Sequence, residues 1–216
     1  MDIAVEVWGD LACFSPPYAK VERQTYPFPT PSAARGILSS LYCKPAEFYW
    51  RIKRIEVLNP IRYISIRRNE VEEKISTQCM PIYADEKRTQ RQTIALQDVR
   101  YRITAEIVPT PAYGGRRTQL EEQALRRIRG GKAYYQPSFG CREFVAYFEE
   151  SDGSRRPQPI DLDAGLMVYD VFDPRDNAVR AKAKPRLSLF HAVLRQGVLE
   201  VPDYDSPEVL KGGAPC

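Results

Sequence analysis

The sequence predicts an α+β fold, with a ferredoxin-like (RRM-like) domain over residues 1–150 and a small β-rich domain over residues 151–216. Apolar residues recur with period two in several segments and with helical spacing in two others. Their coarse order is strand, helix, strand, strand, helix, strand, which is the split βαβ order of ferredoxin-like domains. The run ESDGSRRPQP after Glu149 is rich in turn-forming residues and marks the boundary between the domains.

Strands are expected wherever apolar and polar residues alternate. The first contains Ile3, Val5 and Val7 and ends at Gly9. The others are expected at residues 48–58, 61–67, 99–107 and 142–148, with short strands of the second domain at 166–172 and 198–201. Residues 69–92 are polar and lack periodicity, which predicts an excursion out of the sheet. Whether this excursion contacts RNA, DNA or protein stays open.

Two helices are expected. Thr30 followed by Pro31 is a typical helix start, and an apolar stripe follows before Lys44 and Pro45 end the helix: Ala34, Ile37, Leu38, Leu41. The second helix lies within residues 114–144, with Leu120, Ala124 and Ile128 on one face. Gly130 and Gly131 end it, where a left-handed glycine is expected.

Arginines flank the apolar stripe of the second helix, and aromatic rings follow it. Lys132, Tyr134 and Tyr135 come directly after the glycine pair, so stacking rings lie beside cations. This combination indicates an anion-binding surface. The alternative is a solvated helix face with internal ion pairs such as Glu122 to Arg126.

The composition excludes several classes of protein. Among 216 residues there are 32 Lys and Arg against 28 Asp and Glu, a net charge of +4, and the arginines are clustered. The single histidine, His191, excludes chemistry that needs two histidines. The five cysteines are scattered without a C-x-x-C pair, so neither a disulfide framework nor a zinc site is expected. No carboxylate cluster of the kind a metal-dependent nuclease needs stands out in the motif regions, and no metal or cofactor is expected. The chain opens on a strand and has no long apolar run, which predicts a cytoplasmic location without membrane contact.

Six pieces of the sequence, in order, resemble one known family over nearly the whole chain. They are VWGDLACFSPP, KVERQTY, TPSAARGILSSLYCKP, VLNPIRYISIRRNEV, the GG…QPSFGCREF block, and FHAVLRQGVL followed by SPEV. The chain resembles the CRISPR-associated subunit of type I-C Cascade complexes, within the RAMP superfamily, that caps the crRNA at its five-prime handle and processes precursor crRNA.

The resemblance implies a ferredoxin-like N-terminal domain with a glycine-rich loop and a small β-rich C-terminal domain. It also implies a set of partners. They are the crRNA and its precursor, the Cascade backbone subunits, the large subunit, and target DNA in the assembled complex. Recognition of single-stranded RNA by a basic sheet with aromatic side chains agrees with the residue patterns.

The resemblance also implies metal-independent cleavage, by activation of the 2′-hydroxyl beside the scissile phosphate. Processing members carry a tyrosine at the end of the first helix, which Tyr42 matches. Its hydroxyl either projects beyond the packed stripe or, as is commoner, closes the core with the OH in water. Members also carry a Lys-His pair before the second helix, where this chain has Arg116 and Arg117. The catalytic candidates are therefore Tyr42, Arg116 and Arg117, with Lys44 beside them.

Basic residues and the glycine pair are the candidates for RNA contacts. They are Lys20, Arg23, Arg35, Lys44, Arg67, Arg68, Arg127, Gly130, Gly131, Lys132 and Arg142. Two alternatives to a processing enzyme stay open. One is a non-catalytic structural cap of the crRNA, and the other is a general RNA-binding protein unrelated to CRISPR.

Overall fold

The computed structural model describes residues 1–19, 21–71, 85, 87–175 and 186–212. Its larger sheet has the strand order β5-β1-β4-β2-β8, with every neighbouring pair antiparallel, and β3 pairs with β4 beyond this path. The strands are β1 (Asp2–Ala12), β2 (Phe48–Val57), β3 (Tyr63–Val71), β4 (Arg88–Pro109), β5 (Tyr147–Glu150) and β8 (Val198–Glu200). The α+β class expected from the sequence is confirmed.

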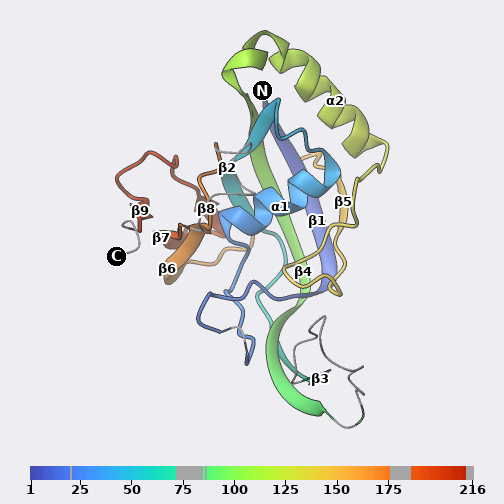
Figure 1. The fold of residues 1–216 in the computed structure, drawn as a ribbon, viewed down its shortest axis with the longest axis vertical. Helices are drawn as coiled ribbons and strands as arrows, with labels where there is room; N and C mark the ends of the chain where they lie inside the picture. Colours follow the sequence, from blue (N-terminus) through green and yellow to red (C-terminus); the bar gives the residue numbers. More distant parts are fainter. Residues whose placement is uncertain (20, 72–84, 86, 176–185, 213–216) are drawn as a thin grey trace, which may run out of the picture.

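A second, three-stranded sheet lies beside the first (Figure 1). It has the order β6-β7-β9 and consists of β6 (Leu162–Asp170), β7 (Ser188–Leu194) and β9 (Leu210–Lys211). One buried cluster unites apolar residues of both sheets and both helices. Phe190 of β7 and Ile103 of β4 belong to it, so the second sheet packs against the N-terminal part of the chain.

The two helices form where the sequence predicts them. Helix α1 (Pro31–Leu41) crosses one face of the larger sheet (Figure 1), and Thr30 Oγ1 accepts a hydrogen bond from the Ala33 N–H at 3.1 Å. A 3₁₀ turn, η1 (Pro111–Arg116), leads into α2 (Arg117–Arg129). Gly131 has φ of +61°, as expected for a left-handed helix end. Among the described residues, no helix is both long and apolar enough to cross a membrane.

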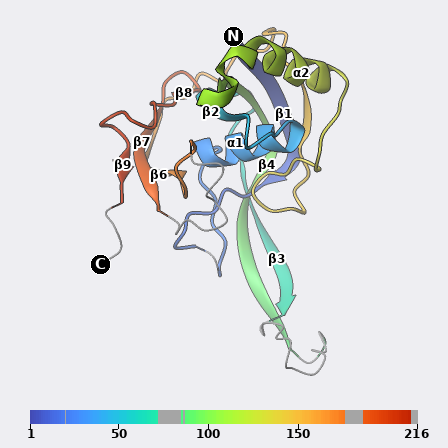
Figure 2. The ribbon, with the colours of Figure 1, turned by 45° about the horizontal axis from the view of Figure 1, so that its top comes forward.

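Strand β3 and the first part of β4 form a two-stranded arm that projects from the body (Figure 2). It pairs Tyr63–Val71 with residues 88–96, from Tyr63 opposite Leu96 to Val71 opposite Arg88. The expectation that residues 69–92 leave the sheet is therefore wrong at both ends, while residues 72–84 and 86 lie outside the described part. The prediction failed because most of β3 and the outer part of β4 have no buried face to impose an apolar alternation.

Two other strand predictions need correction. Residues 142–146 are not a strand, because Gly140 (φ +82°) and the hydrogen bond from the Phe144 N–H to the Cys141 carbonyl form a tight turn before β5. Strand β8 does not belong to the second sheet. The turn at Gln196 and Gly197, both at positive φ, delivers it to the edge of β2 instead.

Candidate functional site

Tyr42 lies at the junction of the two helices and is fully buried. As the C-cap residue of α1 it has an extended backbone, and its N–H donates to the Leu38 carbonyl at 3.0 Å. Its hydroxyl donates a hydrogen bond to Gln123 Oε1 of α2 at 2.9 Å, and its ring stacks on Phe48. The hydroxyl therefore neither projects into solvent nor rests in water, so both sequence-based expectations for it are wrong.

The surroundings of Tyr42 favour its neutral form. Burial raises the pKa of the Tyr42 hydroxyl, and the nearby ammonium group of Lys44 opposes this shift only in part. A neutral phenol donates a hydrogen bond but does not accept the proton of a ribose hydroxyl near neutral pH. Tyr42 therefore acts as a hydrogen-bond donor and not as a general base.

Lys44, Glu47 and Arg116 form an ion-pair chain beside Tyr42. Lys44 Nζ donates to Glu47 Oε1 at 3.1 Å, and this hydrogen bond raises the pKa of Lys44. Arg116 Nη1 lies 3.9 Å from Glu47 Oε2, and about half of the Arg116 side chain is exposed. The structure therefore brings three predicted residues together around one carboxylate that the sequence analysis missed. A lone glutamate three residues after a lysine carries no distinctive signal.

Arg117, the other catalytic candidate, is engaged elsewhere. Its Nε donates to Glu121 at 2.9 Å and its Nη2 to Glu106 at 2.9 Å. Both hydrogen bonds raise the pKa of Arg117, that to Glu121 the more. Arg117 thus fastens the start of α2 to β4.

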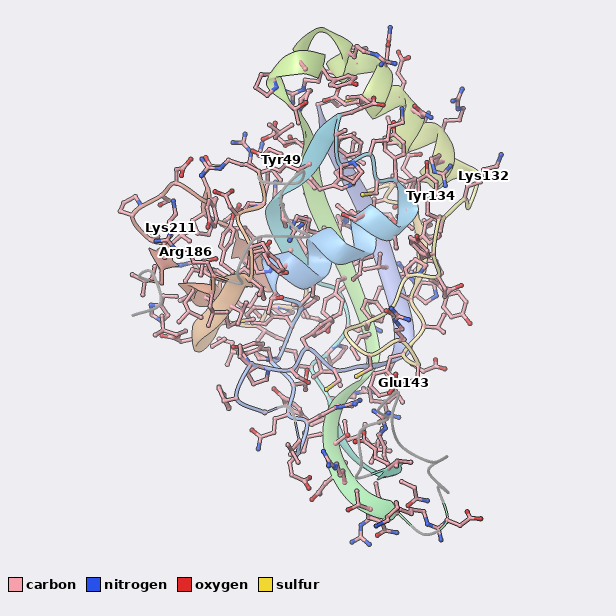
Figure 3. The ribbon with its side chains drawn as sticks, in the orientation of Figure 1. Tyr49, Lys132, Tyr134, Glu143, Arg186 and Lys211 are labelled. Atoms are coloured by element: carbon pink, nitrogen blue, oxygen red, sulfur yellow. The ribbon has the colours of Figure 1, made fainter. Side chains whose placement is uncertain are left out.

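The end of α2 and the segment after it form a cationic and aromatic surface. Arg127 Nε donates to the Leu41 carbonyl at 2.9 Å, and its guanidinium lies 4.3 Å from the centre of the Tyr134 ring. The Tyr134 N–H donates to the Ser40 carbonyl at 2.7 Å, which fixes this ring beside α1. Lys132 and Tyr134 lie together at this end of α2 (Figure 3), and Lys132 is exposed.

A groove runs from this surface along α1. Its walls are α1 and the segment after α2, and they include Gly36, Ser40, Tyr135, Gln136 and Arg142. Tyr135 is 78% exposed, so its ring is free to stack on a base. Gly36 lines the groove without a side chain, and a Cβ at this position would meet nothing within 4 Å.

Of the other predicted RNA contacts, Arg35 is committed to an internal ion pair. Its Nε donates to Asp170 at 3.0 Å, which ties α1 to β6, and its side chain is only 11% exposed. Lys20 lies outside the described residues. Gly130 and Gly131 are exposed at the end of α2, next to Lys132.

A second group of predicted RNA contacts lies at the base of the arm. Arg23 and Arg68 both form ion pairs with Glu143, which Figure 3 places at that base, and Arg23 also lies 3.3 Å from Glu70. Arg67 is exposed on the arm, and Arg142 is exposed at the end of the groove. These cations are therefore distributed over two regions of the surface.

Comparisons with known proteins agree over nearly the whole chain. Two curated proteins, each named CRISPR pre-crRNA endoribonuclease Cas5d, come from Thermus thermophilus and Mannheimia succiniciproducens. The first is 38% identical over 97% of this chain and 95% of its own length, and the second is 37% identical over 97% and 98%.

Solved structures share the fold. The crystal structure of a CRISPR-associated protein superposes with a TM-score of 0.69 at 20% identity, covering 97% of this chain and 96% of the other. A functionally uncharacterized protein from Streptococcus mutans gives 0.68 at 19% identity, with the same coverage. A family model, Cas_Cas5d, described as CRISPR-associated protein (Cas_Cas5), matches residues 2–210. This chain therefore belongs to the Cas5d family of CRISPR-associated proteins.

Proposed function

We propose that this chain binds the repeat-derived five-prime handle of crRNA and cleaves precursor crRNA without a metal ion. The observation that carries the proposal is the identity of 37–38%, over nearly the whole chain, to two proteins named pre-crRNA endoribonucleases. The active group consists of Tyr42, Lys44 and Arg116. This assignment keeps Tyr42 and Arg116 from the sequence analysis and gives Arg117 a structural role.

The geometry of the site supports this function. Arg116 is charged at every relevant pH and half-exposed, so it is suited to stabilise a pentavalent phosphate. Lys44 supplies a second positive charge at the buried Tyr42 hydroxyl. The exposed Tyr135 and the cation Arg142 line the groove along α1, and Lys132 is exposed after the end of α2. Single-stranded RNA binds such surfaces through stacking and phosphate contacts.

The test is cleavage of repeat RNA by the purified protein in EDTA. We expect a single specific cut that yields a 2′,3′-cyclic phosphate and a 5′-hydroxyl, the products of attack by the 2′-hydroxyl. A requirement for added metal, or the absence of any specific cut, contradicts the proposal.

A second function, a non-catalytic cap of the crRNA, is favoured by one observation. The Tyr42 hydroxyl is buried and already hydrogen-bonded to Gln123. Tight binding of processed RNA, with no single-turnover cleavage of the precursor, identifies the cap.

The proposal also covers the fold and the domain organisation of the chain. A ferredoxin-like domain over residues 1–150 is supported by the strand order β5-β1-β4-β2 with two helices in the intervening connections. The β-rich domain over residues 151–216 is supported by the separate β6-β7-β9 sheet, although β8 joins the larger sheet. We further propose assembly with the Cascade backbone and large subunits in the cytoplasm, and contact with target DNA in that complex.

A further inference from the structure

The proposed cleavage needs a group that accepts the proton of the 2′-hydroxyl, and the residues anticipated from the sequence do not supply one. Burial keeps Tyr42 protonated, and Arg116 and Arg117 stay charged. The single histidine, His191, lies on β7 and contacts Asp163 at 2.7 Å. It is part of the second sheet and not of the Tyr42 group.

Glu47 has the chemistry of a proton acceptor. It lies in the turn between α1 and β2, where its N–H donates to the Lys44 carbonyl at 2.8 Å and its own carbonyl accepts from the Thr110 N–H at 2.8 Å. The backbone is therefore fixed on both sides. The carboxylate is held in place as well, because Oε1 accepts the hydrogen bond from Lys44 Nζ.

Oε2, the other oxygen of the Glu47 carboxylate, is in an unusual environment. Glu47 Oε2 is buried and, within the described part of the chain, has no hydrogen-bond partner. A buried carboxylate oxygen without a donor is costly, so its retention needs a reason. Arg116 lies over it at 3.9 Å, beyond hydrogen-bond distance, on a half-exposed side chain that can turn toward a phosphate.

We infer that Glu47 is the general base of RNA cleavage, an inference that rests on the proposed function. In the free protein Arg116 covers Oε2. When Arg116 turns to bind the scissile phosphate, it uncovers Oε2. This oxygen then lies beside the phosphate that Arg116 holds. The carboxylate thus takes the place of the histidine that the family motif carries and this chain lacks.

The proton and the electrons balance within this group. Glu47 Oε2 takes the proton of the 2′-hydroxyl, the new O2′–P bond forms and the P–O5′ bond breaks. The leaving oxygen takes a proton from the Lys44 ammonium group. Glu47 then releases the proton on Oε2 to solvent and neutral Lys44 takes up a proton from solvent, which restores the starting state, with Lys44 Nζ again donating to Oε1, without a cofactor.

Glu47→Gln tests this inference, because it keeps the size of the side chain and removes its basicity. We expect the single-turnover rate of cleavage in EDTA to fall by about 100-fold or more, within the range for loss of a general base. Binding of processed crRNA should stay within about twofold of the wild type, which shows that the variant is folded. Glu47→Asp should retain part of the rate. Glu200→Gln, at an exposed carboxylate of β8, is the matched control and should cleave normally.

A modified substrate separates a base from a residue that only holds Lys44 in place. RNA with sulfur in place of the bridging 5′-oxygen at the scissile bond has a leaving group that needs no acid. Slow cleavage of this RNA by Glu47→Gln supports the base, whereas restored cleavage assigns Glu47 to positioning the acid Lys44 and overturns the inference. A normal rate for Glu47→Gln on ordinary RNA overturns it as well. If the wild-type protein makes no specific cut, the proposed function itself fails.

Discussion

The hydroxyl oxygen of Tyr42 lies 2.9 Å from Oε1 of Gln123, so the end of α1 is hydrogen-bonded to the middle of α2. The same tyrosine accepts a hydrogen bond from Trp50 Nε1 on its backbone carbonyl at 2.8 Å. One residue thereby joins both helices to β2. Its contribution to the fold and its contribution to cleavage must be measured separately.

Tyr42→Phe keeps the ring stacked on Phe48 and removes the hydroxyl. We expect the free energy of unfolding to fall by about 1 kcal/mol, because Gln123 loses its donor, and the single-turnover cleavage rate to fall at least tenfold. Urea denaturation and cleavage in EDTA give the two quantities. Tyr49→Phe, on β2 and outside the proposed site, is the control and should cleave as the wild type does. An unchanged cleavage rate in Tyr42→Phe removes Tyr42 from the active group.

Replacing Arg67, Arg116 and Arg127 together with alanine tests the proposed phosphate contacts. Removal of one arginine–phosphate ion pair should reduce the slope of log K against log salt concentration by about 0.7, so the slope of the triple variant should fall by about 2. The measurement is a titration of handle RNA at several salt concentrations. Arg54→Ala, whose partners Glu56 and Glu200 lie on β2 and β8, should leave the slope unchanged. A wild-type slope in the triple variant shows that these arginines do not bind phosphate.

Local signals made the helices and the core strands predictable. Thr30 and Pro31 start α1, and alternating apolar residues in β1 and β4 face a buried cluster. The outer part of the arm was missed because residues such as Asn69 and Gln90 pair through their backbones while their side chains are exposed. Strand β8 was assigned to the wrong sheet because no sequence pattern specifies which edge a three-residue strand will join.

Only part of the candidate site could be predicted from the sequence. Tyr42 and Arg116 lie in segments that resemble a known family, and the structure places both beside Lys44 and Glu47. Glu47 was not predictable, because its role depends on contacts between segments almost 70 residues apart along the chain. Burial of the Tyr42 hydroxyl was missed for the same reason, since its partner Gln123 lies on the other helix.

Buried carboxylates make the stability of the protein sensitive to acid. Burial alone would raise the pKa of Glu6, but hydrogen bonds from Arg100 and Arg102, each at 3.0 Å, outweigh it and lower the pKa below its ordinary value of 4.5. A carboxylate with a depressed pKa adds stability above its unfolded pKa and loses it as pH falls through the folded value. The free energy of unfolding should therefore decrease below about pH 4.5.

The variant Glu6→Gln tests this assignment. It should be less stable than the wild type at pH 7 and should show a flatter dependence on pH below 4.5. Chemical denaturation at a series of pH values gives both results. Glu200→Gln, at an exposed carboxylate, is the control and should follow the wild-type curve. Parallel curves for Glu6→Gln and the wild type would show that Glu6 does not cause the acid sensitivity.

Gly140→Ala should destabilise the turn before β5. Gly140 has φ of +82°, and a Cβ there would lie 1.9 Å from the carbonyl oxygen of Cys13, so the backbone must move. We expect a loss of about 2 kcal/mol or more in the free energy of unfolding. Gly36→Ala is the matched control. Its Cβ meets nothing within 4 Å and it lies inside α1, so it should stabilise the protein by about 0.5–1 kcal/mol. Equal stability of the two variants contradicts this account.

Strand β4 has 22 residues and a contour length of about 70 Å, and it belongs both to the arm and to the centre of the larger sheet. It bends at Asp98, which has φ of +51°, but β1 pairs with it on both sides of this bend, at Val99 and at Gln97. Pairing with β1 therefore keeps the bend in β4 rigid. The arm is therefore held rigidly by the core. A force on the outer part of the arm is transmitted to the centre of the sheet and does not bend the arm at Asp98.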